Sequence, residues 1–143
     1  MTHCELCDRP ADGIVWEDAL CRVVAVGGGE GEAFPGYCRV VWGRHVAEMT
    51  DLPAAERRHL MNAVFAVEAA VRALCSADKV NLASLGNAVP HLHWHVIPRW
   101  RDDSHFPATV WASARRPARR RAAPTAAALR AAIVLALAEE AAG

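Results

Sequence analysis

Three histidines at alternating positions, His91, His93 and His95, constrain the fold of this chain more than any other feature. Apolar residues occupy the positions between them. In a β-strand, side chains at i, i+2 and i+4 share one face, so the three imidazoles would lie on one surface while the apolar residues face a core. The segment therefore predicts an amphipathic strand from about Val89 to Trp100.

The rest of the chain predicts an α+β fold. Apolar residues recur at spacings of four and three along one segment: Leu60, Val64, Val67, Val71 and Leu74. This stripe predicts a helix that begins after Asp51 and ends near Cys75 or Ser76. Further strands are expected at 14–16, 20–26, 37–42 and 79–85, and a C-terminal helix over 122–143. Glycines and a Pro-Gly turn predict no regular structure over 27–36. Because strands and helices do not alternate as βαβ units, we expect an antiparallel sheet of about five strands.

The composition predicts a single globular domain. The chain has 143 residues, 53% of them hydrophobic, which suffices to bury a core. Its 16 basic and 16 acidic side chains cancel, which argues against an obligatory nucleic-acid binder. No apolar run approaches the roughly 20 residues that a membrane span needs, and the first residues lack the apolar region of a secretory signal. We therefore expect a cytoplasmic protein that does not bind membranes.

Two parts are expected along the chain. Residues 1–111 would form the domain, with an N-terminal arm over 1–13 that carries a Cys-x-x-Cys pair. Residues 112–143 would form a tail, in which a solvated arginine-rich linker over 115–121 precedes an alanine-rich helix. The five cysteines are an odd number, which excludes a complete set of intramolecular disulfides and suits the reducing cytosol.

The histidine pattern supports two kinds of chemistry. Neutral imidazoles can ligate a metal ion, so a metal-dependent enzyme would use His91, His93 and His95 as ligands. Alternatively, one imidazole acts as a nucleophile while its neighbours position the substrate. A row of exposed histidines without a role is the third interpretation, and three alternating histidines among only seven in the chain argue against it.

The segment HLHWHVIP, preceded by the turn GNAVP, resembles the signature of the histidine triad (HIT) superfamily of nucleotide hydrolases and transferases. The resemblance covers about residues 4–111. It implies that His93 attacks the α-phosphorus of a purine nucleotide derivative and forms a covalent nucleotidyl-histidine, while His95 holds a phosphate oxygen. It also implies a homodimer. A further set of residues would lie beside the phosphate: Asn81, Gly86, Asn87, Ala88 and Val89.

The resemblance has one departure that bears on activity. Many members of the superfamily carry Gln followed by Ser or Thr where this chain has Asn87 and Ala88. The missing hydroxyl removes one hydrogen-bond donor from the phosphate or the leaving group. A non-catalytic nucleotide-binding or adaptor protein on the same scaffold is therefore an alternative to a phosphoramidase, dinucleoside polyphosphate hydrolase or nucleotidyltransferase.

Cys4 and Cys7 have the spacing of half a tetrahedral zinc site, although such a pair also suits a redox dithiol or two packing cysteines. Some HIT proteins, and the related galactose-phosphate uridylyltransferases, bind zinc through a CxxC pair, a histidine before the long helix and the first histidine of the triad. The resemblance thus implies a structural zinc held by Cys4, Cys7, His45 and His91. His3 is an alternative ligand.

Other reactive side chains are predicted to be structural. Cys21, Cys38 and Cys75 lie in apolar contexts and are expected to pack in the core. His59 is expected to be a solvated surface residue, and His105 is not favoured as a member of the site. The tryptophans are expected mostly in the core or in dimer contacts, with one of them free to stack on a base.

Overall fold

A computed structural model describes residues 3–8 and 13–143. Along the chain its elements are β1 (Ile14–Glu17), β2 (Cys21–Ala25), α1 (Gly28–Ala33), β3 (Cys38–Trp42), a 3-10 turn (Met49–Asp51), α2 (Ala54–Cys75), β4 (Lys79–Ala83), β5 (His93–Arg99) and α3 (Ala126–Ala142). The five strands form one antiparallel sheet in the order β1-β2-β3-β5-β4. The predicted α+β fold is confirmed.

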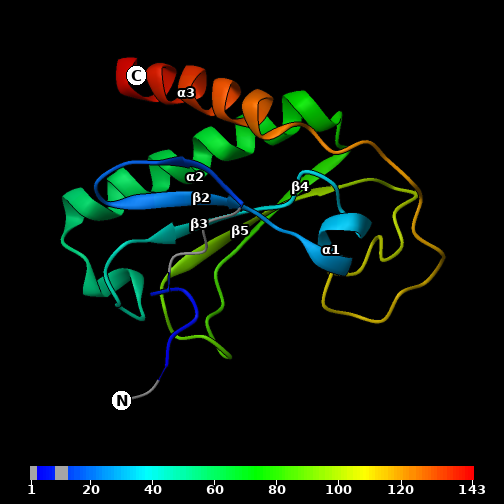
Figure 1. Cartoon of the computed structure of the whole chain (residues 1–143), viewed down its shortest axis with the longest axis horizontal. Helices are drawn as coiled ribbons and strands as arrows, with labels where there is room; N and C mark the ends of the chain where they lie inside the picture. Colours follow the sequence, from blue (N-terminus) through cyan, green and yellow to red (C-terminus); the bar gives the residue numbers. More distant parts are fainter. Residues whose placement is uncertain (1–2, 9–12) are drawn as a thin grey trace.

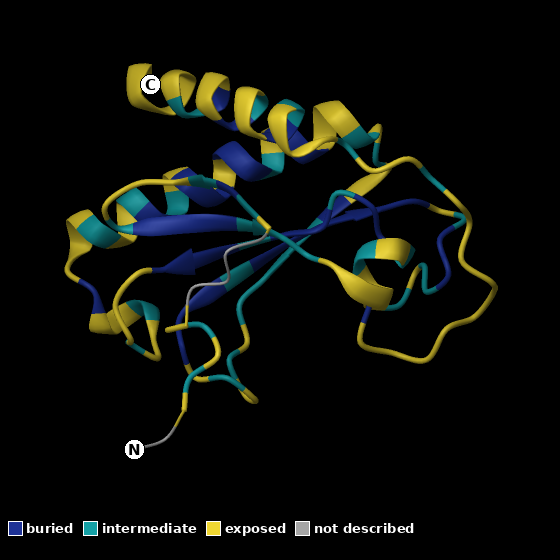
Figure 2. Cartoon of the chain, in the orientation of Figure 1, coloured by how far each residue is buried: buried dark blue, intermediate teal, exposed yellow. Residues whose placement is uncertain are grey.

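Helix α2 covers one face of the sheet, and α3 packs alongside α2 (Figure 1). The chain enters α2 through Pro53, where a missing N–H costs nothing, and leaves it at Ser76, which adopts a left-handed conformation. Four residues of the predicted stripe of α2, from Leu60 to Val71, lie in the core with Leu129 and Ile133 of α3, whereas the fifth, Leu74, is exposed. Buried residues concentrate in the central strands and on the inner side of α2 (Figure 2).

The two faces of the sheet have different chemistry. Alternate residues of β3, including Val40 and Trp42, belong to the core beneath α2. Arg39 lies between the core residues Cys38 and Val40 in sequence and pairs directly with His95 of β5. Side chains alternate between faces along a strand, so Arg39, His93 and His95 share the face that α2 does not cover.

Strand β5 begins at His93, four residues later than predicted. Pro90 has no N–H to offer a strand ladder, and the segment before it turns at Gly86, whose φ is +79°. The N–H of Leu92 instead bonds to the carbonyl of Val46 at 2.7 Å. His91 therefore lies outside the regular strand, and the expectation of three histidines on one continuous strand is wrong for the first of them.

Residues 27–36, predicted to lack regular structure, contain the six-residue helix α1. Gly31 explains part of this result. A Cβ at that position would lie 2.2 Å from the carbonyl oxygen of Val26, so a glycine lets the helix approach the residue that follows β2 closely. The glycines that appeared to exclude structure thus allow close packing at one position.

The arginine-rich segment is exposed over 115–120, as expected for a solvated linker, but two of its arginines anchor it to the domain. The guanidinium of Arg116 donates to the carbonyls of Asp103 and Phe106, at 2.6 and 2.9 Å. That of Arg121 lies 4.4 Å from the ring centroid of Trp100 and pairs with Asp102. Within residues 3–8 and 13–143, no helix is both long enough and apolar enough to cross a bilayer.

Candidate active site and metal cluster

His93 and His95 line a recess of about 330 Å³ on the uncovered face of the sheet. The other residues that line it are Glu5, Leu6, Arg39, Leu85, Gly86, Asn87, Ala88, Val89 and Trp111. The structure thus brings the turn over 86–89 beside two triad histidines, as the sequence predicted. It also brings in the N-terminal arm, through Glu5 and Leu6.

The ring of His93 is held in one orientation. Its Nδ1 lies 2.6 Å from the backbone carbonyl oxygen of His91. A carbonyl oxygen only accepts hydrogen bonds, so Nδ1 carries the hydrogen and Nε2 keeps a lone pair. The hydroxyl of Ser84 donates to the carbonyl of His93 at 2.7 Å and fixes the backbone beneath the ring. An imidazole held in this tautomer is suited to act as a nucleophile through Nε2.

His95 is buried and uncharged. Its Nδ1 lies 2.7 Å from the hydroxyl of Tyr37, and its ring meets His93 and Trp111 edge to face. Burial, followed by the positive charges that His93 and Arg39 can carry, lowers the pKa of His95 to about 4. Burial also raises the pKa of Tyr37 to about 12. At neutral pH both partners are therefore neutral, and the phenol keeps its proton.

Asn81 lies beside a neighbouring recess rather than beside His93 and His95. Its side-chain oxygen accepts a hydrogen bond from the guanidinium of Arg99 at 2.8 Å. It lines a second recess, of about 360 Å³, and Trp111 lines both recesses. The exposed Trp111 ring is thus the side chain that the two recesses share.

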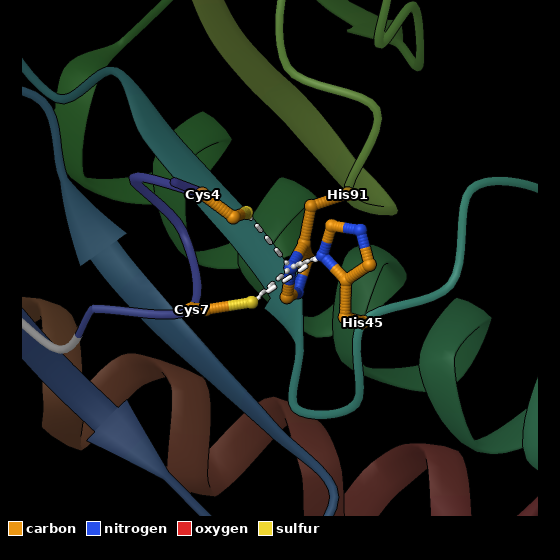
Figure 3. A group of neighbouring side chains, drawn as sticks. All are labelled: Cys4, Cys7, His45 and His91. Atoms are coloured by element: carbon orange, nitrogen blue, oxygen red, sulfur yellow. Dashed lines mark hydrogen bonds between the residues drawn. The ribbon is translucent and has the colours of Figure 1, made fainter. Parts of the chain in front are cut away.

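A second cluster forms next to the triad from the side chains of Cys4, Cys7, His45 and His91 (Figure 3). The sulfur atoms lie 3.3–3.6 Å from the nearest imidazole nitrogens, and the two Nδ1 atoms lie 3.2 Å apart. A tetrahedral zinc, with Zn–S about 2.3 Å and Zn–N about 2.0 Å, would place neighbouring ligand atoms about 3.3–3.8 Å apart. The donor set and its spacing therefore fit a metal ion of this kind.

The orientation of His91 also suits a metal ligand. Its Nε2 lies 2.6 Å from the carbonyl oxygen of Trp42, while its Nδ1 faces the two thiols. A hydrogen bond from the second ring nitrogen to a carbonyl is the usual support of a metal-bound imidazole. Burial and the neighbouring His45 lower the pKa of His91, whereas the bond to Trp42 acts in the opposite direction. The net lowering favours the neutral imidazole. His3 lies apart, beside Asp8 at 3.1 Å.

Residues assigned to structural roles lie mostly where they were expected. Burial raises the pKa of Cys21 and of Cys38 to about 12 and that of Cys75 to about 11, so these thiols stay protonated. His105 bonds to Ser104 at 2.7 Å and does not line the recess.

His59 lies at the surface, as expected, with 40% of its side chain exposed, but it is paired with Asp18. Its Nε2 lies 2.7 Å from an oxygen of Asp18, whose other oxygen accepts from two backbone N–H groups. His59, Asp18 and Cys21 lie close enough to hold a metal, but these hydrogen bonds account for the arrangement as a cap on the turn between β1 and β2.

Sequence reasoning missed Tyr37, which contacts His95 from the buried side, and it did not assign several lining residues to the site: Glu5, Leu6, Arg39, Leu85 and Trp111. Tyr37 and Arg39 stand two positions apart at the start of a predicted strand, and that alternation was the available signal. Trp111 lies eight residues after Asp103 with no periodicity to place it. The loop between them is held by Arg99, which bonds to Asp103 and to the carbonyl of Ala108.

Comparison with known proteins agrees with this architecture. An asymmetrical bis(5′-nucleosyl)-tetraphosphatase from Schizosaccharomyces pombe is 32% identical over 74 residues, which are 48% of this chain and 41% of that enzyme. The chain thus matches less than half the length of that relative. Histidine triad proteins from Marinobacter aquaeolei and Bradyrhizobium japonicum have similar crystal structures, each 27% identical, with TM-scores of 0.66 and 0.63. The first alignment covers 88% of both chains, and the second covers 89% of this chain and 88% of the other. The HIT domain profile matches residues 30–102, and the chain belongs to the HIT domain family.

Proposed function

We propose that this protein is a nucleotide hydrolase or nucleotidyltransferase that cleaves at the α-phosphate of a purine nucleotide derivative. The observation that carries the proposal is the 2.6 Å hydrogen bond from His93 Nδ1 to the His91 carbonyl, because it leaves the Nε2 lone pair of a recess-lining residue free to attack. The name of the yeast relative, a bis(5′-nucleosyl)-tetraphosphatase, supports a substrate of this class.

The reaction would proceed in two displacements. Nε2 of His93 attacks the α-phosphorus, and the bond from phosphorus to the leaving group breaks as the leaving group takes a proton from solvent. The nucleotidyl group is then bonded to His93, whose Nδ1–H stays on the His91 carbonyl. Water or another acceptor attacks the same phosphorus, releases a proton and the nucleotide product, and restores the free imidazole.

The remaining residues would stabilise charge on the phosphate oxygens. If the Tyr37 hydroxyl donates to Nδ1 of His95, the other ring nitrogen carries a hydrogen and can donate to a phosphate oxygen. The turn over Gly86, Asn87, Ala88 and Val89 would offer backbone N–H groups and the Asn87 amide. Asn81 would assist from the adjoining recess.

We further propose that the second cluster holds a structural zinc. Cys4, Cys7, His45 and His91 would complete a closed four-ligand site, which leaves no position for substrate. Such an ion would join the N-terminal arm to the segment before β5 and would keep Glu5 and Leu6 on the wall of the recess. The homodimer and the cytoplasmic location stay predictions, as does the division of the chain into a HIT domain over 1–111 and a tail over 112–143.

The geometry favours covalent catalysis over a metal-dependent reaction at the triad. His91 faces the thiols of the cluster, His93 directs Nδ1 to a carbonyl, and His95 directs Nδ1 to Tyr37. If the three histidines bound one metal ion, one nitrogen of each ring would instead point toward a common position. The oriented nucleophile also argues against a purely non-catalytic adaptor.

Intact-mass spectrometry tests the proposal. Wild-type protein, mixed with adenosine 5′-phosphoramidate or diadenosine tetraphosphate and quenched within milliseconds, should carry one added adenylyl group and should release AMP on longer incubation. The His93→Ala variant should show neither, whereas His59→Ala, which removes a histidine outside the recess, should behave as wild type. Normal turnover by His93→Ala, or no adduct and no turnover by wild type on either substrate, would overturn the assignment.

A further inference from the structure

Arg39 stands next to His95 on the floor of the recess. The two residues are direct partners across β3 and β5, and both face away from α2. Directly paired residues have Cβ atoms about 4.5–5.5 Å apart, well within the reach of an arginine side chain. Arg39 also lies over the ring of Tyr37, with its guanidinium carbon 6.0 Å from the ring centroid.

The recess has little positive charge with which to bind the phosphate groups of a nucleotide. Among the described residues that line it, Arg39 is the one with a permanent positive charge, while Glu5 contributes a negative one. The low pKa of His95 keeps that ring neutral at pH 7. The Ala88 side chain offers no hydrogen-bond donor to the recess. A phosphate bound here therefore needs a cation that the triad itself does not supply.

Arg39 is available for such a contact. Its guanidinium lies 3.7 Å from a carboxylate oxygen of Glu30 in α1, and the two side chains are 35% and 45% exposed. Ion pairs of this exposure contribute little to stability, because water screens them and both side chains lose freedom. Exchange of Glu30 for a phosphate oxygen would therefore cost little, and a guanidinium binds phosphate through two parallel hydrogen bonds.

We propose that Arg39 binds a phosphate oxygen of the nucleotide and supplies the charge that makes this site prefer nucleotides over nucleosides. This inference rests on the proposed function, since it assigns a ligand to the same recess. Glu30 acts as the counter-ion of Arg39 when no nucleotide is bound.

Calorimetric titration of the non-reacting His93→Ala protein with AMP and with adenosine separates phosphate recognition from recognition of the base and ribose. When Arg39→Gln is introduced into the His93→Ala protein, AMP binding should weaken by about 10- to 100-fold, the range for loss of a charge-assisted hydrogen bond. Adenosine binding should stay within about twofold. Arg39→Lys should fall between, because it keeps the charge and loses the paired geometry.

Two control variants exclude a merely structural effect. Arg44→Gln removes the same charge from another ion pair, that of Arg44 with Glu56, outside the recess, and should leave both affinities unchanged. Glu30→Gln breaks the ion pair of Arg39 but keeps the arginine, so AMP binding should stay the same or strengthen.

If Glu30→Gln weakens AMP binding as much as Arg39→Gln does, or if Arg39→Gln weakens AMP and adenosine equally, Arg39 is not a phosphate ligand. If His93→Ala binds neither compound and wild type turns over no nucleotide, the proposed function itself fails.

Discussion

The backbone carbonyl of His91 accepts the Nδ1 hydrogen of His93 at 2.6 Å, while the ring of His91 points the other way, into the cluster with Cys4 and Cys7. One residue thus belongs to both sites. Its side chain belongs to the candidate metal cluster, and its main chain sets the tautomer of the candidate nucleophile. A change in the position of His91 would therefore reach His93 directly, through one hydrogen bond.

Tyr37→Phe should slow catalysis without unfolding the protein. The variant keeps the buried ring but removes the hydroxyl that lies 2.7 Å from His95 Nδ1. Without that partner, His95 is free to change tautomer and to turn the wrong nitrogen toward the phosphate. We expect kcat on adenosine 5′-phosphoramidate to fall about tenfold, the cost of one buried hydrogen bond, with a smaller change in KM.

The pH profile distinguishes this role from simple packing. Loss of the hydroxyl should shift the acidic limb of kcat, because it changes the environment of the His95 ring. A variant with normal kcat and an unshifted limb would show that Tyr37 does not position His95.

The buried His95 should make stability depend on pH between about 4 and 6.5. Its pKa falls from 6.5 in the unfolded chain to about 4 in the folded one, so between these values the unfolded state binds the extra proton. The contribution of His95 to the free energy of unfolding is therefore fully present above pH 6.5. It declines as the pH falls toward 4, by at most about 3 kcal/mol. Urea unfolding of wild type and His95→Gln at pH 7 and pH 5 measures it. The difference in unfolding free energy between the two proteins should shrink at pH 5, and a constant difference would contradict the prediction.

Local patterns were sufficient to predict much of this fold. The helix over 54–75 follows from its apolar stripe, with Pro53 before it and the left-handed Ser76 after it. The residues of the metal cluster followed from the spacing of Cys4 and Cys7 together with the family resemblance. Such features depend on neighbours in sequence, or on a motif that fixes distant residues by analogy.

Features that depend on strand register could not be predicted. Arg39 becomes a site residue only because β3 pairs with β5 at the register that sets it opposite His95. A shift of one residue would turn its side chain into the core. The place of His91 was missed for a related reason, since three alternating histidines fit a strand equally well whether or not Pro90 interrupts the ladder.

Asp103 and its neighbour Asp102 should differ sharply in their effect on stability. Asp103 is 2% exposed, accepts two hydrogen bonds from Arg99 and caps three backbone N–H groups of the loop that leads to Trp111. Asp103→Asn leaves the buried guanidinium without a carboxylate counter-ion and should cost about 3–5 kcal/mol in urea unfolding. Asp102→Asn, which alters only ion pairs with Arg119 and Arg121 on a half-exposed carboxylate, should cost much less. Equal losses would mean that the buried pair does not hold the loop.

Removal of the proposed zinc should loosen the recess as well as the arm. Cys4 and Cys7 flank Glu5 and Leu6, which line the recess with His93, so loss of the ion would release one wall of the site. Wild type purified without chelator should contain about one zinc per chain by elemental analysis. Cys7→Ser should lower zinc affinity at least 100-fold, lower the melting temperature and weaken AMP binding. The matched variant Cys75→Ser, which changes a thiol outside the cluster, should keep its zinc.

A wild-type protein without zinc, whose melting temperature and AMP affinity do not change when zinc is added, would rule the site out. Loss of zinc with unchanged AMP affinity would separate the cluster from the recess, because the arm would then hold Glu5 and Leu6 in place without the ion.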